Sequence, residues 1–234
     1  MTAKTTLLLL PGLLCDAALW RHQAEHLADV AEIRIPDLTR QDSMAEMARA
    51  ALALAPDGKF ALAGLSMGGY VALEIMRQAP GRVSRLALFD TSSRADDAEL
   101  ASRRRGLIEL AGKGQFKGVT QRVLKLYLHP DRLADAALAG AVMAMAERVG
   151  REAFLRQQTA IQGRPDSRPG LAAIACPTLV VCGRQDMLTP MEWSEEIAAG
   201  IPGARLVAIE DCGHLSTMER PEAATALLRD WLQP

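Results

Sequence analysis

The stretch from Phe60 to Tyr70 constrains the fold of this chain more than any other part of its sequence. Residues 60–63 form an apolar run of strand length, and residues 71–77 have the composition of a helix. Between them lies Gly64-Leu65-Ser66-Met67-Gly68, which matches the G-x-S-x-G motif of a nucleophilic serine on a sharp strand-to-helix turn. Glycines flank such a serine because a Cβ at either position would collide with the facing turn. The motif therefore predicts a strand, an accessible Ser66, and a helix whose N-terminal amides point toward that serine.

Short apolar runs alternate with helical patterns along most of the chain. Besides the run at Phe60, the segments that are expected to be strands are residues 5–10, 31–35, 83–89, 178–181 and 205–209. Alternation of strands with helices favours an α/β fold with a doubly wound, mostly parallel sheet, here of about six strands. Nearly continuous apolar strands are typical of parallel strands that are covered on both faces.

The alternation pauses after Thr91. Residues 94–170 are rich in alanine, arginine and leucine, have helical spacing, and contain no strand-like run. We interpret this segment as a helical lid that is inserted into a core of residues 1–93 and 171–234. Such a lid would cover the edge of the sheet where the carboxyl ends of the strands meet.

Length and composition limit the classes of protein to consider. A chain of 234 residues can bury one sizeable core, and its 49% hydrophobic and 24% charged residues are typical of globular proteins. A net charge of -1 gives no reason to expect binding to nucleic acid or to a membrane, and no segment has the length of a membrane span. The four cysteines lack C-x-x-C spacing, which favours free thiols in a reducing compartment. We expect a cytoplasmic monomer or homodimer without a metal or cofactor.

Two loops offer partners for a nucleophilic Ser66. A serine nucleophile needs a base, and the base needs a carboxylate that orients it. Asp186 follows the strand at residues 178–181, and His214 follows the strand at residues 205–209. Because the carboxyl ends of parallel strands meet at one edge, the sequence predicts a catalytic triad of Ser66, Asp186 and His214.

Two further aspartates compete with Asp186 for the role of the orienting acid. Asp90 ends the strand at residues 83–89 and ranks second. Asp211 lies three residues before His214, and we interpret it as a brace of that loop. Both alternatives stay open here, since an aspartate at the end of any of these strands reaches the same edge.

The loop after the first strand is a candidate for the oxyanion hole. Gly12 allows close approach of the backbone, and we expect the amides of Leu13 and Met67 to stabilise the oxyanion. The alternative is an ordinary turn that ends the strand. The side chains that we expect to line the substrate pocket are apolar: Leu14, Trp20, Met143, Leu188 and Leu215.

Two charged motifs suggest other functions. His22-Gln23-Ala24-Glu25-His26 matches the H-x-x-E-H motif of zinc metalloproteases and places two imidazoles one helical turn apart. The sequence offers no obvious third ligand, so a zinc site is the less favoured interpretation. Arg103-Arg104-Arg105, in the predicted lid, is either a solvated helix face or a binding site for an anionic group of a substrate or acyl carrier.

Together these motifs resemble the α/β-hydrolase superfamily along nearly the whole chain. The similarity includes Pro11-Gly12-Leu13 with Trp20, the GLSMGG turn, the lid, and the loops of Asp186 and His214. Within the superfamily, the chain is similar to a small bacterial branch of pimeloyl-carrier methyl esterases, enol-lactone hydrolases and cofactor-free haloperoxidases. Two features depart from the family pattern. Pro11-Gly12 replaces the usual His-Gly, and we expect the first two strands of the full fold to be absent, since residues 5–10 correspond to the third.

The resemblance implies a serine hydrolase that acts on a carboxylic ester, thioester or lactone. Its substrate is expected to be a small acyl ester, either free or bound to a carrier. Hydrolysis of a carbon–carbon bond and perhydrolysis use the same residues, and the sequence does not separate these reactions because the lid selects the substrate. A slow-turnover ligand receptor of the same fold is a further alternative.

Overall fold

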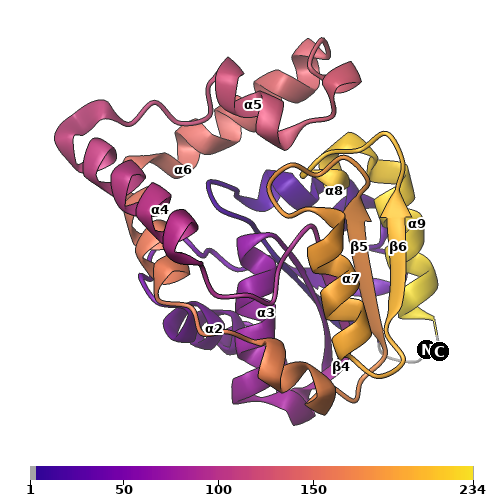
Figure 1. Ribbon diagram of the computed structural model, residues 1–234. Helices are drawn as coiled ribbons and strands as arrows, with labels where there is room; N and C mark the ends of the chain where they lie inside the picture. Colours follow the sequence, from indigo (N-terminus) through magenta and orange to yellow (C-terminus); the bar gives the residue numbers. More distant parts are fainter. Residues whose placement is uncertain (1–3, 234) are drawn as a thin grey trace.

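The computed structural model describes residues 4–233, which form one sheet with helices on both faces (Figure 1). Its six strands run in the order β2-β1-β3-β4-β5-β6, and every neighbouring pair is parallel. The strands are β1 Thr5–Leu10, β2 Ala31–Arg34, β3 Phe60–Leu65, β4 Val83–Phe89, β5 Thr178–Gly183 and β6 Arg205–Ile209. The predicted fold class is confirmed, and each strand lies on one of the apolar runs identified from the sequence.

The helices of residues 4–233 connect these strands and supply both covering layers. They are α1 Arg21–His26, α2 Met44–Ala53, α3 Met67–Gln78, α4 Ala98–Leu110, α5 Gln121–Tyr127, α6 Ala136–Gln162, α7 Met191–Gly200, α8 Ser216–Glu219 and α9 Pro221–Leu232. None of the helices in this part of the chain combines the length and the apolar composition that crossing a bilayer requires.

The side chains of β1 alternate between two hydrophobic clusters. Leu7 and Leu9 enter the cluster that includes Leu228 of α9, whereas Leu8 and Leu10 enter the cluster that α2, α3 and α7 cover. Successive side chains of a strand point to opposite faces, so an apolar residue at every position buries β1 on both sides. The nearly continuous apolar run at residues 5–10 thus has its physical reason in the two helical layers.

The segment between β4 and β5 is helical. It contains α4, α5 and α6, which lie along the left and the top of the view in Figure 1. The long α6 is bent at Gly150, whose φ of 76° and ψ of 178° depart from helical values. This segment includes the predicted lid at residues 94–170, and it brings α4, α5 and α6 over the loops at the carboxyl ends of the strands.

The four cysteines are free thiols. Cys15, Cys182 and Cys212 are buried and Cys176 is half-buried, and none of them forms a disulfide. Burial raises the pKa of the Cys15 thiol to about 12, with a further contribution from the charge of Asp16, so this thiol is uncharged at neutral pH.

Candidate active site

Ser66 lies on the sharp turn between β3 and α3. Its φ of 56° and ψ of -116° fall in a region that residues with a side chain rarely adopt. Two hydrogen bonds hold this backbone: the N–H of Ser66 donates to the carbonyl of Phe89 at 3.0 Å, and the hydroxyl of Thr91 donates to the carbonyl of Ser66 at 2.8 Å. A strained serine that its surroundings hold in place is typical of a nucleophile elbow.

Gly64 and Gly68 allow the start of α3 to pack directly against neighbouring backbone. A Cβ on Gly64 would lie 2.3 Å from the carbonyl oxygen of Gly68, and a Cβ on Gly68 would lie 2.1 Å from that of Leu10. Neither approach is sterically possible. The collision predicted for both positions is therefore confirmed, and it involves backbone atoms that cannot move aside cheaply.

The loops after β5 and β6 bring Asp186 and His214 together. Nδ1 of His214 lies 2.8 Å from Oδ2 of Asp186, and the side chains are 2% and 0% exposed. The hydroxyl of Thr189 donates to the same carboxylate oxygen at 2.6 Å, and the N–H groups of Leu188 and Thr189 donate to Oδ1 at 2.8 and 3.0 Å. The carboxylate is thus satisfied on both oxygens and fixes the orientation of the imidazole.

Asp186 and His214 each stabilise the charged form of the other. Burial alone raises the pKa of Asp186, but the neighbouring His214 and the hydrogen bonds that the carboxylate accepts lower it by more. Burial alone lowers the pKa of His214, but the negative charge of Asp186 raises it by more. Asp186 is therefore ionised at neutral pH and stabilises the protonated form of His214.

The lid holds the loop that carries His214. The N–H of His214 donates to the carbonyl of Tyr127 at 2.8 Å, at the end of α5. The buried carboxylate of Glu219 accepts hydrogen bonds from two segments, with Oε1 bound to the N–H of Gly213 at 3.0 Å and Oε2 to that of His129 at 2.7 Å. Residues 127–129 are therefore attached to the backbone on both sides of the candidate base.

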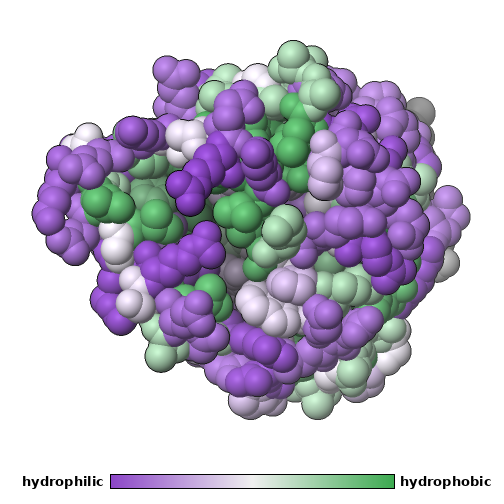
Figure 2. Space-filling view, turned by 45° about the horizontal axis from the view of Figure 1, so that its top comes forward, coloured by the Kyte–Doolittle hydropathy of each residue, from purple (hydrophilic) through white to green (hydrophobic). Residues whose placement is uncertain are grey.

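A cavity of about 610 Å³ lies between the sheet edge and the lid, and both Ser66 and His214 line it. Figure 2 shows apolar side chains gathered inside a hollow that hydrophilic residues surround. Much of the lid side of the wall is apolar: Leu100, Leu107, Leu110, Phe116, Val119, Val123, Leu126, Phe154 and Ile161. A concave, mostly apolar cavity with a few polar groups at one end is typical of a small-molecule site.

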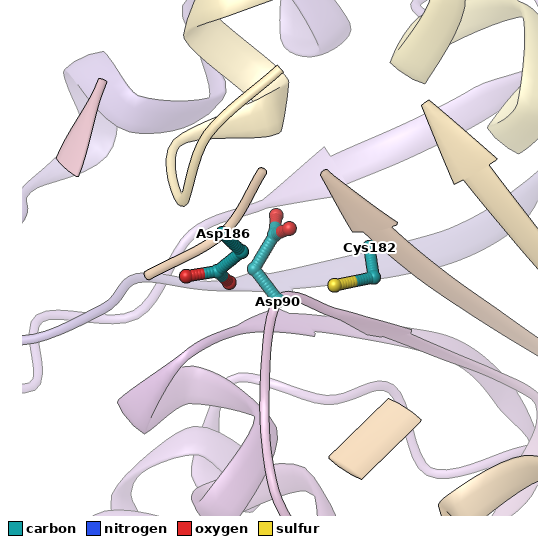
Figure 3. Close-up of side chains that lie close together, drawn as sticks. All are labelled: Asp90, Cys182 and Asp186. Atoms are coloured by element: carbon teal, nitrogen blue, oxygen red, sulfur yellow. The ribbon is translucent and has the colours of Figure 1, made fainter. Parts of the chain in front are cut away.

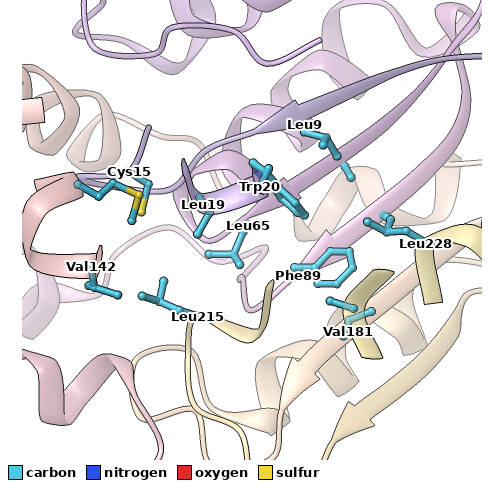
Figure 4. Packing of buried hydrophobic residues seen from close by; sticks show 14 of the residues in the cluster. Leu9, Cys15, Leu19, Trp20, Leu65, Phe89, Val142, Val181, Leu215 and Leu228 are labelled. Carbon is cyan, nitrogen blue, oxygen red and sulfur yellow. The ribbon is translucent and has the colours of Figure 1, made fainter. Parts of the chain in front are cut away.

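Three of the predicted pocket residues, Leu14, Leu188 and Leu215, line this cavity, but Trp20 and Met143 do not. Trp20 is fully buried and faces the core. Its indole N–H donates to the carbonyl of Leu10 at 3.1 Å, and its ring packs edge-on against Phe89 (Figure 4). Met143 packs against the same hydrophobic cluster from α6. Both side chains support the core instead of facing a substrate.

The sequence analysis did not identify the wall that α5 provides. Val123, Leu126 and Tyr127 of α5 line the cavity at positions i, i+3 and i+4, which is the spacing of one face of a helix. That spacing is the signal that could have found them.

The candidate oxyanion loop runs beside Ser66. Gly12 and Leu13 line the cavity, and a Cβ on Gly12 would lie 3.5 Å from Cβ of Ser66. Among residues 4–233, no acceptor pairs with the N–H of Leu13, and Met67 begins α3, where the first N–H groups have no partner within the helix. The next amide, that of Leu14, donates to the side chain of Gln157 in α6 at 3.0 Å.

The two competing aspartates have other partners. Asp90 accepts a hydrogen bond from the N–H of Gly183 at 2.8 Å and contacts the hydroxyl of Ser216. Asp211 is exposed and pairs with Arg220 at 3.7 Å, as expected for a residue that braces its loop. The imidazole of His214 is therefore paired with Asp186.

Candidate metal ligands are poorly suited to an ion. Asp90, Cys182 and Asp186 have ligand atoms within 4.8 Å of one another (Figure 3). However, both carboxylates are already hydrogen-bonded, and burial raises the pKa of the Cys182 thiol, which disfavours the thiolate that a metal needs. At the H-x-x-E-H motif, the rings of His22 and His26 stack at 3.9 Å, and no third ligand joins them within the described residues.

The arginines of α4 differ in their surroundings. Arg103 and Arg104 line the cavity and Arg105 does not. Arg104 is committed to neighbours within the lid, since it contacts Asp96 at 2.7 Å and Gln158 at 2.9 Å. Arg103 is the exposed cation of the pair.

A parallel sheet that carries a strained serine turn and an Asp–His pair at its carboxyl edge defines an α/β hydrolase. The chain belongs to this family: residues 5–221 match the family described as "alpha/beta hydrolase fold". It is 30% identical over 193 residues to the pimeloyl-[acyl-carrier protein] methyl ester esterase of Neisseria meningitidis, which covers 80% of this chain and 75% of that protein. The resemblance stated from the sequence is confirmed.

Solved structures are similar over almost the whole chain. An esterase from Thermogutta terrifontis is 30% identical and superposes with a TM-score of 0.89, covering 98% of this chain and 90% of its own. The enol-lactonase from Burkholderia xenovorans LB400 superposes with a TM-score of 0.87 over 98% of this chain and 92% of its own, at 21% identity, which supports the fold alone. The protein is thus an α/β hydrolase whose relatives at about 30% identity include esterases.

Proposed function

We propose that this protein is a carboxylic ester hydrolase that forms an acyl-enzyme on Ser66. One observation carries the proposal: a serine on a strained turn and an imidazole that Asp186 orients at 2.8 Å share the wall of one cavity. A nucleophile and an oriented base that face a common space are the requirement for acyl transfer.

The reaction follows from these positions. With the Nδ1 proton of His214 donated to Asp186, Nε2 is free to take the proton of Ser66 as its oxygen attacks the acyl carbon. The carboxylate stabilises the imidazolium that forms, and the N–H groups of Leu13 and Met67 bind the oxyanion. The imidazolium then protonates the leaving alcohol, and a water molecule, activated by the same imidazole, releases the acid.

The cavity supports a substrate with an apolar acyl group. Its volume of about 610 Å³ accommodates a small molecule, and its wall combines the apolar lid residues with a charged edge of Arg103, Lys117, Asp97 and Glu99. The Neisseria relative acts on a methyl ester of a carrier-bound acyl chain, as its name states. By analogy, we propose an acyl ester, thioester or lactone, free or bound to a carrier.

Labelling with a fluorescent fluorophosphonate tests the nucleophile. Wild type and Ser43→Ala, a control at the half-buried N-cap of α2, should be labelled, and Ser66→Ala should not. Turnover of p-nitrophenyl esters should fall to nearly the background rate in Ser66→Ala alone, because a triad works as a unit. Undiminished turnover in that variant would contradict the assignment.

A series of esters then defines the acyl group. The series varies the chain length and compares neutral chains with chains that end in a carboxylate. A folded wild-type protein that neither reacts with the probe nor hydrolyses any ester would exclude the proposed hydrolase and favour a ligand receptor of the same fold.

A further inference from the structure

A second buried carboxyl group lies beside the Asp186 that the proposed mechanism uses. Asp90 directly follows β4 with a φ of 44°, and it is 0% exposed. Figure 3 shows its carboxyl group between the side chains of Asp186 and Cys182, and ligand atoms of these three residues lie within 4.8 Å of one another. Asp90 does not line the cavity that Ser66 and His214 share, so its role is separate from substrate binding there.

The two aspartates differ in the donors that surround them. The Asp186 carboxylate faces four donors: the N–H groups of Leu188 and Thr189, the hydroxyl of Thr189, and Nδ1 of His214. Asp90 has one N–H donor, that of Gly183 at 2.8 Å, and one hydroxyl neighbour, that of Ser216. A hydroxyl can either donate or accept, so the Asp90 site suits an uncharged carboxylic acid as well as an anion.

Charge decides between these two forms. The titratable groups that face Asp90 are Asp186 after β5, His214 and Cys212 after β6, and Cys182 of β5. Two carboxylates this close together in a buried site do not both ionise at neutral pH. The carboxylate with more hydrogen-bond donors keeps the charge, and that carboxylate is Asp186. Burial and the charge of Asp186 both raise the pKa of Asp90 well above its ordinary value.

We propose that Asp90 is an uncharged positioning residue of the site on which the proposed hydrolase function rests. Its carbonyl oxygen accepts the N–H of Gly183, and its acid O–H donates to the hydroxyl oxygen of Ser216. Gly183 ends the strand that leads to Asp186, and Ser216 follows His214 by two residues. The neutral side chain therefore joins the two loops that carry the acid and the base.

Neutrality at Asp90 also matters for His214. A second anion at this place would stabilise the imidazolium further and raise the pKa of His214. A larger fraction of the imidazole would then be protonated at neutral pH, and that fraction could not accept the proton of Ser66. An uncharged acid joins the loops without adding this charge.

Two substitutions separate the neutral form from the anion. In Asp90→Asn, the amide carbonyl replaces the acceptor and the amide NH₂ replaces the donor, so kcat/KM should stay within about threefold of wild type and the acid limb of its pH profile should not move. Asp90→Ala breaks the link, and its kcat should fall about tenfold with little change in KM. An acid limb that moves about one pH unit lower in Asp90→Asn would show that the wild-type residue is an anion and overturn the proposal.

Urea unfolding tests whether Asp90 carries a proton in the native state, and the test does not depend on enzyme activity. A native state that holds a proton on Asp90 binds one more proton at that side chain than the unfolded state above the ordinary aspartate pKa, so the contribution of Asp90 to the free energy of unfolding falls as pH rises from about 4. Asp90→Asn has no titratable group at this position, so it lacks this pH-dependent loss of stability. Its unfolding midpoint should rise relative to wild type between pH 5 and pH 8, and the difference should vanish at low pH. A difference that is the same at all pH values would overturn the proposal, even in a protein that hydrolyses no ester.

Discussion

The two halves of the lid are joined to the rest of the molecule in different ways. In α4, no residue is buried, and Leu107 and Leu110 remain 40% and 48% exposed although they line the cavity. By contrast, residues 127–129 bind the loop of His214 through the carbonyl of Tyr127 and the carboxylate of Glu219. We infer that α4 shapes the space for the substrate, whereas residues 127–129 belong to the structure that holds the base.

The largest effect is expected at the Asp186–His214 pair, because residues 127–129 hold the loop that carries His214. Asp186→Asn removes the charge that stabilises the imidazolium and loses the preference for the correct tautomer, so kcat should fall about 10³–10⁴-fold. The carboxylate raises the pKa of His214, so the acid limb of kcat/KM should lie above the ordinary histidine value in wild type and move to lower pH in the variant. Steady-state kinetics between pH 5 and 9 measure both. An acid limb that does not move would show that Asp186 is not the partner of the base.

An intermediate effect is expected at Glu219, whose carboxylate joins residues 127–129 to the loop of His214. Both carboxylate oxygens of Glu219 accept an N–H, so the amide of Glu219→Gln must turn its NH₂ group toward one of two donors. An unpaired buried donor costs about 1–3 kcal/mol, and we expect kcat to fall about tenfold to a hundredfold with a smaller change in KM. Glu222→Gln, at an exposed position on α9, is the matched control. Equal kinetics in the two variants would remove the distinction between the lid halves.

The smallest effect is expected in α4, where no residue is buried. Leu110→Ala trims an exposed wall of the cavity, so unfolding should change by no more than about 0.5 kcal/mol. Specificity should change instead, with kcat/KM for long-chain esters reduced about threefold to tenfold and that for acetyl esters unchanged. A chain-length series with p-nitrophenyl esters measures this. A uniform loss for all chain lengths would mean that α4 contributes to the catalytic structure itself.

Local sequence patterns predicted the sheet well. The run at residues 5–10 corresponds to β1, and the run at residues 83–89 to β4, because strands that are buried on both faces must be apolar throughout. The turn at Ser66 could also be predicted, since its glycines and serine are neighbours in the chain. Asp186 and His214 could be placed at one edge for a topological reason, because the ends of parallel strands meet there.

Roles that depend on contacts between distant segments could not be predicted. Trp20 was assigned to the pocket, but the partner of its indole is a carbonyl of β1, which the sequence does not reveal. Nothing in the sequence distinguishes Arg104 from its neighbours in the arginine run, yet its guanidinium donates to the side chains of Asp96 and Gln158. The roles proposed for Asp90 and Glu219 depend in the same way on segments about 90 residues away.

The hydrogen bond between Leu14 and Gln157 has a consequence for how this protein can acquire new substrates. The side-chain amide of Gln157 accepts the N–H of Leu14 through its oxygen and donates to the carbonyl of Leu38 through its nitrogen, so α6 helps to hold the candidate oxyanion loop. Exchange of residues around Leu107 can therefore alter substrate preference while the chemistry is retained. Exchange of the whole lid would remove Gln157 as well, and an enzyme redesigned in that way would have to recover the geometry of its oxyanion hole before any new preference could be expressed.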